Sequence, residues 1–135
     1  MTAADSTTIR TLAARGVGTV AIASVVNLVL AWTALTQNLV ASTEFFQYSR
    51  IVAWTILGTV GATVVYGVLT RRSVTPDVTF VRIAAVVLVL SFLPNIGLLI
   101  AVESVTTSEV IGLMALHVPP ALVAMLALPN TPLGR

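Results

Sequence analysis

The sequence predicts an all-α integral membrane protein, folded as an up-down four-helix bundle with both termini on the cytoplasmic side. Three observations lead to this prediction. Of the 135 residues, 57% are hydrophobic and only 9% are charged, a composition outside the range of soluble globular domains. The charged residues lie between four apolar stretches, each of about twenty residues. The arginines fall almost entirely on one side of the crossings that these stretches define.

The four apolar stretches are expected to form a single transmembrane domain over residues 1–135, with spans at about 16–35, 51–70, 81–101 and 109–128. Twenty residues at ~1.5 Å per residue cross a hydrocarbon core of ~30 Å. The apolar part of the first span is longer than the ~7–15 residues of a signal peptide, so we expect it to remain a span. Short connections make sequential helices antiparallel, which favours the up-down bundle.

The distribution of arginine predicts the orientation. One side of the membrane receives Arg10, Arg15, Arg71, Arg72, Arg82 and Arg135, and the other receives Arg50 alone. Because cytoplasmic segments carry the excess of basic residues, the first set is expected inside. So uneven a distribution also argues against a dual-topology dimer.

The second span carries small residues at helical spacing. Gly58 and Ala62 lie four residues apart, with Gly61 beside them. Small residues at this spacing let membrane helices approach closely, so we expect these three to pack against a neighbouring helix. The pattern is common in membrane helices and indicates no binding site.

Polar residues lie within the apolar spans: Asn27 in the first, Asn95 in the third and His117 in the fourth. Counting the helical rise from the flanking charged residues places these three side chains, and Gly58, about 18–20 Å above the inner boundary of the hydrocarbon core. Ser91 lies one turn before Asn95. The sequence therefore predicts a candidate polar layer, inside the bundle, made of Asn27, Ser91, Asn95 and His117.

Three prolines are expected to break the last two spans: Pro94, Pro119 and Pro120. Proline has no N–H, so three carbonyls lose their usual helical donor, those of Leu90, Ala115 and Leu116. Side chains or waters must then satisfy these carbonyls, and Asn95 and His117 are suitable donors. His117 is also the one ionisable residue deep inside a span, so a role toward a substrate, a proton or a lipid stays open.

The other polar residues have structural interpretations beside functional ones. Asn27 is expected to hydrogen-bond across helices, with a place in a binding layer as the alternative. Ser91 either bonds back to its own helix or joins the layer. Glu103 and Glu109 flank the third loop, where helix capping is favoured over metal binding.

Several functions are excluded or disfavoured. The net charge is +2, and the arginines are scattered between apolar stretches, so we expect no nucleic-acid partner. There is no cysteine, which excludes disulfides and thiolate sites. Paired carboxylates, a Gly-rich phosphate loop and an HExxH zinc motif are all missing. We therefore expect no catalytic residue, no metal and no other cofactor, and we do not expect an enzyme.

Two short elements, SFLPN at residues 91–95 and LMALH at residues 113–117, resemble domain-of-unknown-function family 6069. The third helix of that family carries a similar S-F-x-P-[acid or amide] element, and its fourth an L-M-x-x-H element. The resemblance extends to the pattern of spans and implies four helices in a bacterial inner membrane, with no assigned activity. Asn95 stands where the family is expected to favour aspartate, which would remove a protonatable group.

Three functions follow as hypotheses. The first is a multi-pass membrane protein with a structural, accessory or partner-binding role. The second is a small transporter or channel subunit that uses Asn27, Asn95 and His117. The third, a membrane enzyme or quinone-handling accessory protein, is the weakest because one titratable group lies in the membrane. The lipid bilayer is the expected partner, and a homo-oligomer or a membrane partner protein stays open.

Overall fold

The computed structural model describes residues 3–40 and 46–130. Over these residues the chain is all-α and forms six helices: α1 Ala3–Thr36, α2 Tyr48–Arg72, α3 Pro76–Leu90, α4 Phe92–Ala101, α5 Thr107–Ala115 and α6 Val118–Ala127. The all-α prediction is confirmed.

Four helical stretches of the described chain are long and apolar enough to cross a membrane: Ile9–Thr36, Tyr48–Arg72, Pro76–Ala101 and Thr107–Ala127. The third stretch combines α3 with α4, and the fourth combines α5 with α6. The four spans expected from the sequence overlap these stretches. The last two are interrupted at Ser91 and at residues 116–117, close to the three prolines.

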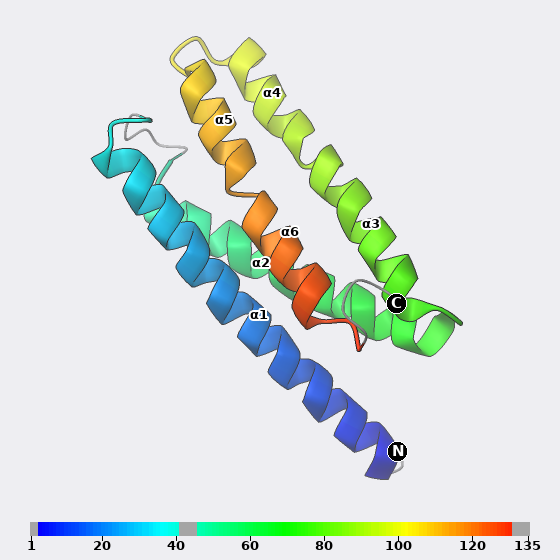
Figure 1. The fold of residues 1–135 in the computed structure, drawn as a ribbon. Helices are drawn as coiled ribbons and strands as arrows, with labels where there is room; N and C mark the ends of the chain where they lie inside the picture. Colours follow the sequence, from blue (N-terminus) through cyan, green and yellow to red (C-terminus); the bar gives the residue numbers. More distant parts are fainter. Residues whose placement is uncertain (1–2, 41–45, 131–135) are drawn as a thin grey trace.

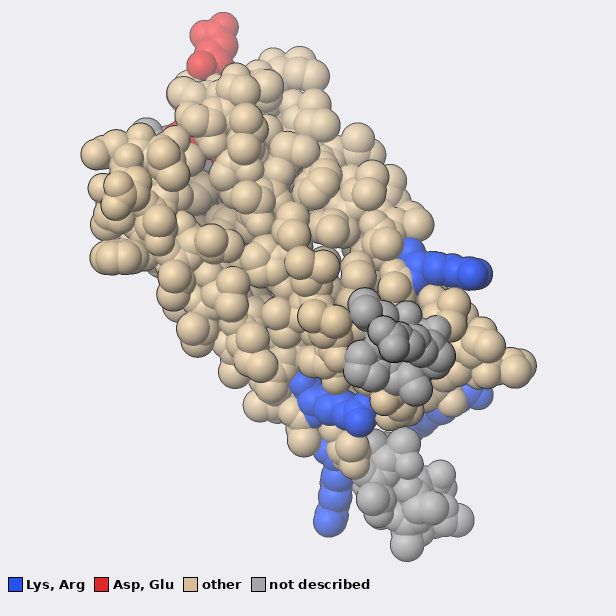
Figure 2. Space-filling view, viewed as in Figure 1, with Lys and Arg blue, Asp and Glu red and all other residues tan. Residues whose placement is uncertain are grey.

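The helices pack as an elongated bundle (Figure 1). Helix α1 packs against α2 and α6, α3 packs against α2 and α6, and α4 pairs with α5. The beginning of α1, the turn between α2 and α3 and the end of α6 lie at one end of the bundle, which we call the basic end. Arg side chains gather toward this end, and acidic side chains are visible at the opposite, outer end (Figure 2).

The core has two apolar clusters. The first, toward the outer end, contains Ala31, Val40, Phe46, Ile51 and Leu116. The second, toward the basic end, contains Tyr66, Phe80, Ala124 and Leu128. Along α1 and α2, the buried polar residues Asn27, Thr55 and Thr59 lie between these clusters. The polar centre of the bundle is therefore enclosed by apolar packing on both sides.

The packing expected at Gly58 and Gly61 needs correction. Both glycines are exposed, and a Cβ at either position would have no atom within 4 Å. The inward face of α2 is formed instead by Ile51, Thr55, Thr59 and Tyr66, and Gly58 and Gly61 lie on the other side of the helix. Ala62 is partly buried and packs against the second cluster.

Other glycines allow close approaches between elements. A Cβ on Gly16 of α1 would lie 2.7 Å from Cγ2 of Thr63 in α2. A Cβ on Gly67 would lie 2.9 Å from the Leu12 side chain. Since real Cβ atoms essentially never make contacts this short, α1 and α2 can pack this closely because both positions are glycine.

Glu109 caps the N-terminus of α5. The backbone N–H of Glu109 donates to Oγ1 of Thr106 over 3.3 Å, and the N–H of Thr106 donates to Oε2 of Glu109 over 2.9 Å. This reciprocal pair is a capping box, which satisfies two backbone donors at the start of the helix. The structure thus confirms the capping role expected for Glu109.

Candidate functional site

Asn27 is the centre of the candidate site. Its side chain is only 2% exposed, and its Nδ2 donates to Oγ1 of Thr55 over 2.8 Å and to the carbonyl of Leu116 over 2.9 Å. One amide group therefore connects α1, α2 and the junction between α5 and α6.

The carbonyl of Leu116 is available because the helix is interrupted at this point. In a continuous helix it would accept from the N–H of residue 120, and that residue is Pro120. Asn27 takes the place of this missing backbone donor. The sequence correctly indicates a freed carbonyl at Leu116, but the expected donors were Asn95 and His117, and the actual donor comes from another helix.

The residue of α2 that reaches the polar layer is Thr55, and not Gly58 as expected. Its Oγ1 accepts from Asn27 and donates to the carbonyl of Ile51 over 2.7 Å. Thr59 and Thr63 repeat the second bond, each donating to the carbonyl four residues earlier. The four-residue spacing of these threonines was the signal in the sequence for the polar, inward side of α2.

His117 satisfies a different carbonyl at the same break. The backbone N–H of His117 bonds to Met114, three residues back, so the carbonyl of Leu113 loses its helical donor. The Nδ1 of His117 lies 2.7 Å from that carbonyl oxygen. Because a carbonyl only accepts, we assign the proton to Nδ1, and Nε2 of the neutral ring is then an acceptor. His117 therefore satisfies a backbone carbonyl freed at the helix break, as expected. That carbonyl belongs to Leu113 and not to Ala115 or Leu116.

Ser91 and Asn95 lie at the break between α3 and α4. The Oγ of Ser91 donates to the carbonyl of Leu88 over 2.6 Å, so Ser91 bonds back to its own helix, as the sequence favours. The Nδ2 of Asn95 donates to the carbonyl of Ser91 over 3.2 Å, and the Asn95 side chain is 7% exposed. The sequence predicts a bond from Asn95 to the carbonyl of Leu90, but Asn95 bonds to the carbonyl of Ser91 instead.

The structure brings part of the expected layer together. Asn27, Thr55 and the Leu116 carbonyl form one hydrogen-bonded group, and His117 follows Leu116 directly. The ring of Phe92 meets the edge of the His117 ring with centroids 6.5 Å apart, so the two helix breaks adjoin. Gly58 does not belong to the layer.

Among the described side chains of α1, two buried oxygen atoms have no hydrogen-bond partner: Oγ of Ser24 and Oδ1 of Asn27. Ser24 and Asn27 are three residues apart, so they share one side of the helix. A buried acceptor without a partner costs about 1–3 kcal/mol, and such groups are commonly satisfied by buried water. The centre of the bundle can therefore accept a hydrogen bond from water or from another small donor.

A second polar group ties the helices together at the basic end, and sequence reasoning missed it. The hydroxyl of Tyr66 donates to Oδ1 of Asp77 over 2.6 Å and accepts from the N–H of Asn130 over 3.1 Å. Nη1 of Arg15 donates to the Leu128 carbonyl over 3.1 Å and to Oδ1 of Asn130 over 2.8 Å. Arg15 thus satisfies the end of α6, where terminal carbonyls favour a cation.

The described residues hold no group of three or more His, Cys, Asp or Glu side chains that could bind a metal ion. The central site consists of amides, hydroxyls and one imidazole, which exchange hydrogen bonds. No family model, no curated protein and no solved structure matches this chain.

Proposed function

We propose that this chain is a multi-pass protein of the bacterial inner membrane, with both termini cytoplasmic, and that its role is structural, accessory or partner-binding. One observation carries the proposal: the polar side chains of the centre are engaged with backbone carbonyls of the bundle itself. Asn27 satisfies Leu116, His117 satisfies Leu113 and Asn95 satisfies Ser91. These bonds stabilise interrupted helices.

The surface supports placement in a membrane. Large apolar side chains on the outside of several helices are well exposed, among them Val17, Trp54 and Ile100. In water such a surface would favour aggregation, whereas a bilayer covers it. We also propose that residues 91–95 and 113–117 relate the chain to domain-of-unknown-function family 6069, which would imply a bacterial inner membrane. The bilayer is then the direct partner, and a second copy or another membrane protein is the partner class for an accessory role.

Replacement of Asn27 by Leu tests the structural role. The variant leaves the carbonyl of Leu116 without its donor in an apolar surrounding, so we expect a loss of about 1–3 kcal/mol in the free energy of unfolding. Reversible unfolding in mixed micelles, followed by circular dichroism, measures the change. A variant as stable as the wild type would contradict the proposal that Asn27 holds the bundle together.

The two unpartnered acceptors favour one alternative, a small transporter or channel subunit with its polar layer around Asn27, Asn95 and His117. Ser24 Oγ and Asn27 Oδ1 are free to bind a passing donor, and the Nε2 of His117 is available as a proton acceptor. If the layer conducts protons, proteoliposomes that contain a pH-sensitive dye acidify when a proton gradient is applied. We expect His117→Asn to abolish this flux without preventing assembly. Equal flux in the variant would remove His117 as a relay.

A further inference from the structure

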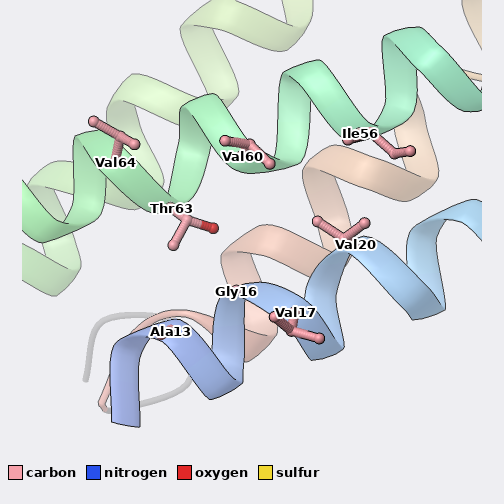
Figure 3. A pocket seen from close by; sticks show the side chains of 8 residues that line it. All are labelled: Ala13, Gly16, Val17, Val20, Ile56, Val60, Thr63 and Val64. Atoms are coloured by element: carbon pink, nitrogen blue, oxygen red, sulfur yellow. The ribbon is translucent and has the colours of Figure 1, made fainter. Parts of the chain in front are cut away.

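An apolar groove runs along the outside of the bundle between α1 and α2 (Figure 3). It has a volume of about 280 Å³, and its walls include Val17 and Val20 of α1 and Val60 and Val64 of α2. Val17 is 70% exposed and Val64 is 60% exposed, so the walls project outward from the bundle.

The floor of the groove lies at a close approach between α1 and α2. Gly16 has no side chain, and Thr63 of α2 lies directly against it. The Thr63 hydroxyl donates to the carbonyl of Thr59 over 2.8 Å. This hydroxyl proton is therefore occupied within α2, and the groove offers an apolar surface suited to a hydrocarbon chain.

Two arginines stand at the basic end of this groove. Arg10 lies seven residues before Val17, and Arg71 lies seven residues after Val64. Seven residues are close to two helical turns, so each arginine shares the face of its helix that carries a groove wall. Both arginines are exposed.

The register of the two helices places these arginines at nearly the same level. Gly16 lies against Thr63, and Leu12 lies against Gly67, so antiparallel pairing continues toward Arg10 and Arg71. Their Cα atoms differ in level by about two residues, or ~3 Å along the axis. The register thus places one arginine from each helix at the basic end of the groove.

The depth of these groups matches the layers of a bilayer. Arg10 precedes Gly16 by six residues, which is about 9 Å along α1. The headgroup layer extends the hydrocarbon core by about 5–8 Å on each side. With Arg15 near the boundary, most of the groove lies in hydrocarbon, and Arg10, five residues farther out, lies at the level of the headgroup layer.

We propose that the groove between α1 and α2 binds one acyl chain of an anionic phospholipid, whose phosphate is held between Arg10 and Arg71. The groove alone fits any hydrocarbon chain. The pair of arginines selects a headgroup with net negative charge, because guanidinium groups bind phosphate oxygens through charge-assisted, often bidentate hydrogen bonds. This site is separate from the polar centre, and it rests on the proposed placement of the chain in a bilayer.

Native mass spectrometry of the full chain in detergent tests the site, with phosphatidylglycerol and phosphatidylcholine as probes. We expect one tightly bound phosphatidylglycerol and weaker binding of phosphatidylcholine. Arg10→Gln with Arg71→Gln should reduce the preference for phosphatidylglycerol about tenfold. The matched control is Arg72→Gln with Arg82→Gln. Arg72 lies about 100° around α2 from Arg71, so this control should keep the preference.

The groove itself is tested by filling it. Val17→Phe on one wall, or Val64→Phe on the other, should reduce binding of both lipids. Val25→Phe, on the same helix but outside the groove, should bind like the wild type. Equal binding of the two lipids by the wild type would overturn the proposal. An equal loss of the preference for phosphatidylglycerol in both arginine double variants would also overturn it. Unchanged lipid binding by folded Val17→Phe and Val64→Phe variants would do the same.

Discussion

At the scale of single residues, the bond between Asn27 and Leu116 is specific because a proline creates the need for it. A buried amide in an apolar surrounding has lost its hydrogen bonds to bulk water. The Leu116 carbonyl receives no hydrogen bond from residue 120, which is proline. Each group is costly alone, and the cost is removed when they meet over 2.9 Å.

This dependence gives the Asn27→Leu prediction a control. In a Pro120→Ala background, the new N–H of residue 120 can donate to the Leu116 carbonyl. Asn27→Leu should then cost clearly less than in the wild type, with a coupling of about 0.5–3 kcal/mol between the two positions. Purely additive losses in the double-mutant cycle would show that Asn27 does not act through this carbonyl.

Depth could be predicted for these residues, but rotation about the helix axis could not. Asn27 and Gly58 were placed at one level by counting the helical rise, yet Asn27 faces inward and Gly58 faces outward. Asn95 has the right depth and is buried, but its amide bonds within its own span. Rotation depends on packing of whole faces, which four nearly uniformly apolar helices hardly encode in their sequences.

At the scale of elements, the pair formed by α1 and α2 is set by small residues at a few contact points. A Cβ on Gly16 would lie 2.7 Å and 3.0 Å from the two γ atoms of Thr63, whose side chain is branched at Cβ and therefore stiff. Sequence patterns drew attention to Gly58 and Gly61, because closely spaced glycines are conspicuous. Gly16 and Gly67 lie on different helices, and the register of α1 and α2 brings them against Thr63 and Leu12.

Matched glycine substitutions distinguish these positions. Gly16→Ala introduces a Cβ 2.7 Å from Cγ2 of Thr63, so α1 and α2 must separate, and we expect a loss of about 1–3 kcal/mol in the free energy of unfolding. Gly58→Ala meets no neighbour within 4 Å and should be neutral or stabilising by up to about 1 kcal/mol. Thermal unfolding in detergent compares the two. Destabilisation by Gly58→Ala would mean that its face is packed in solution.

At the scale of the whole molecule, the two ends differ in kind. The basic end is held by Arg15, Tyr66, Asp77 and Asn130, a group that brings residues 15 and 130 together. The four apolar stretches could be predicted from composition, because hydrophobicity and length determine a span. This group could not, because its members are isolated polar residues far apart in the chain, and only the folded bundle places them side by side.

The unequal ends lead to a prediction of orientation. The chain has no cysteine, so a single one can be introduced at Val74, between α2 and α3, or at Ser104, between α4 and α5. Val74 is 99% exposed and Ser104 is also exposed, so neither change disturbs packing. Because basic segments stay in the cytoplasm, an impermeant maleimide should label Ser104→Cys in intact spheroplasts and Val74→Cys only after lysis.

The opposite labelling pattern would overturn the proposed orientation, and equal labelling of both variants before lysis would indicate dual topology. The arginines make the second outcome unexpected, since Arg10, Arg71 and Arg82 lie toward the basic end, whereas Arg50 lies in the first turn of α2, at the other end. Arg50→Ser should therefore leave the pattern unchanged. The orientation also determines which leaflet would supply the lipid proposed for the groove between α1 and α2, because Arg10 and Arg71 lie on the basic side.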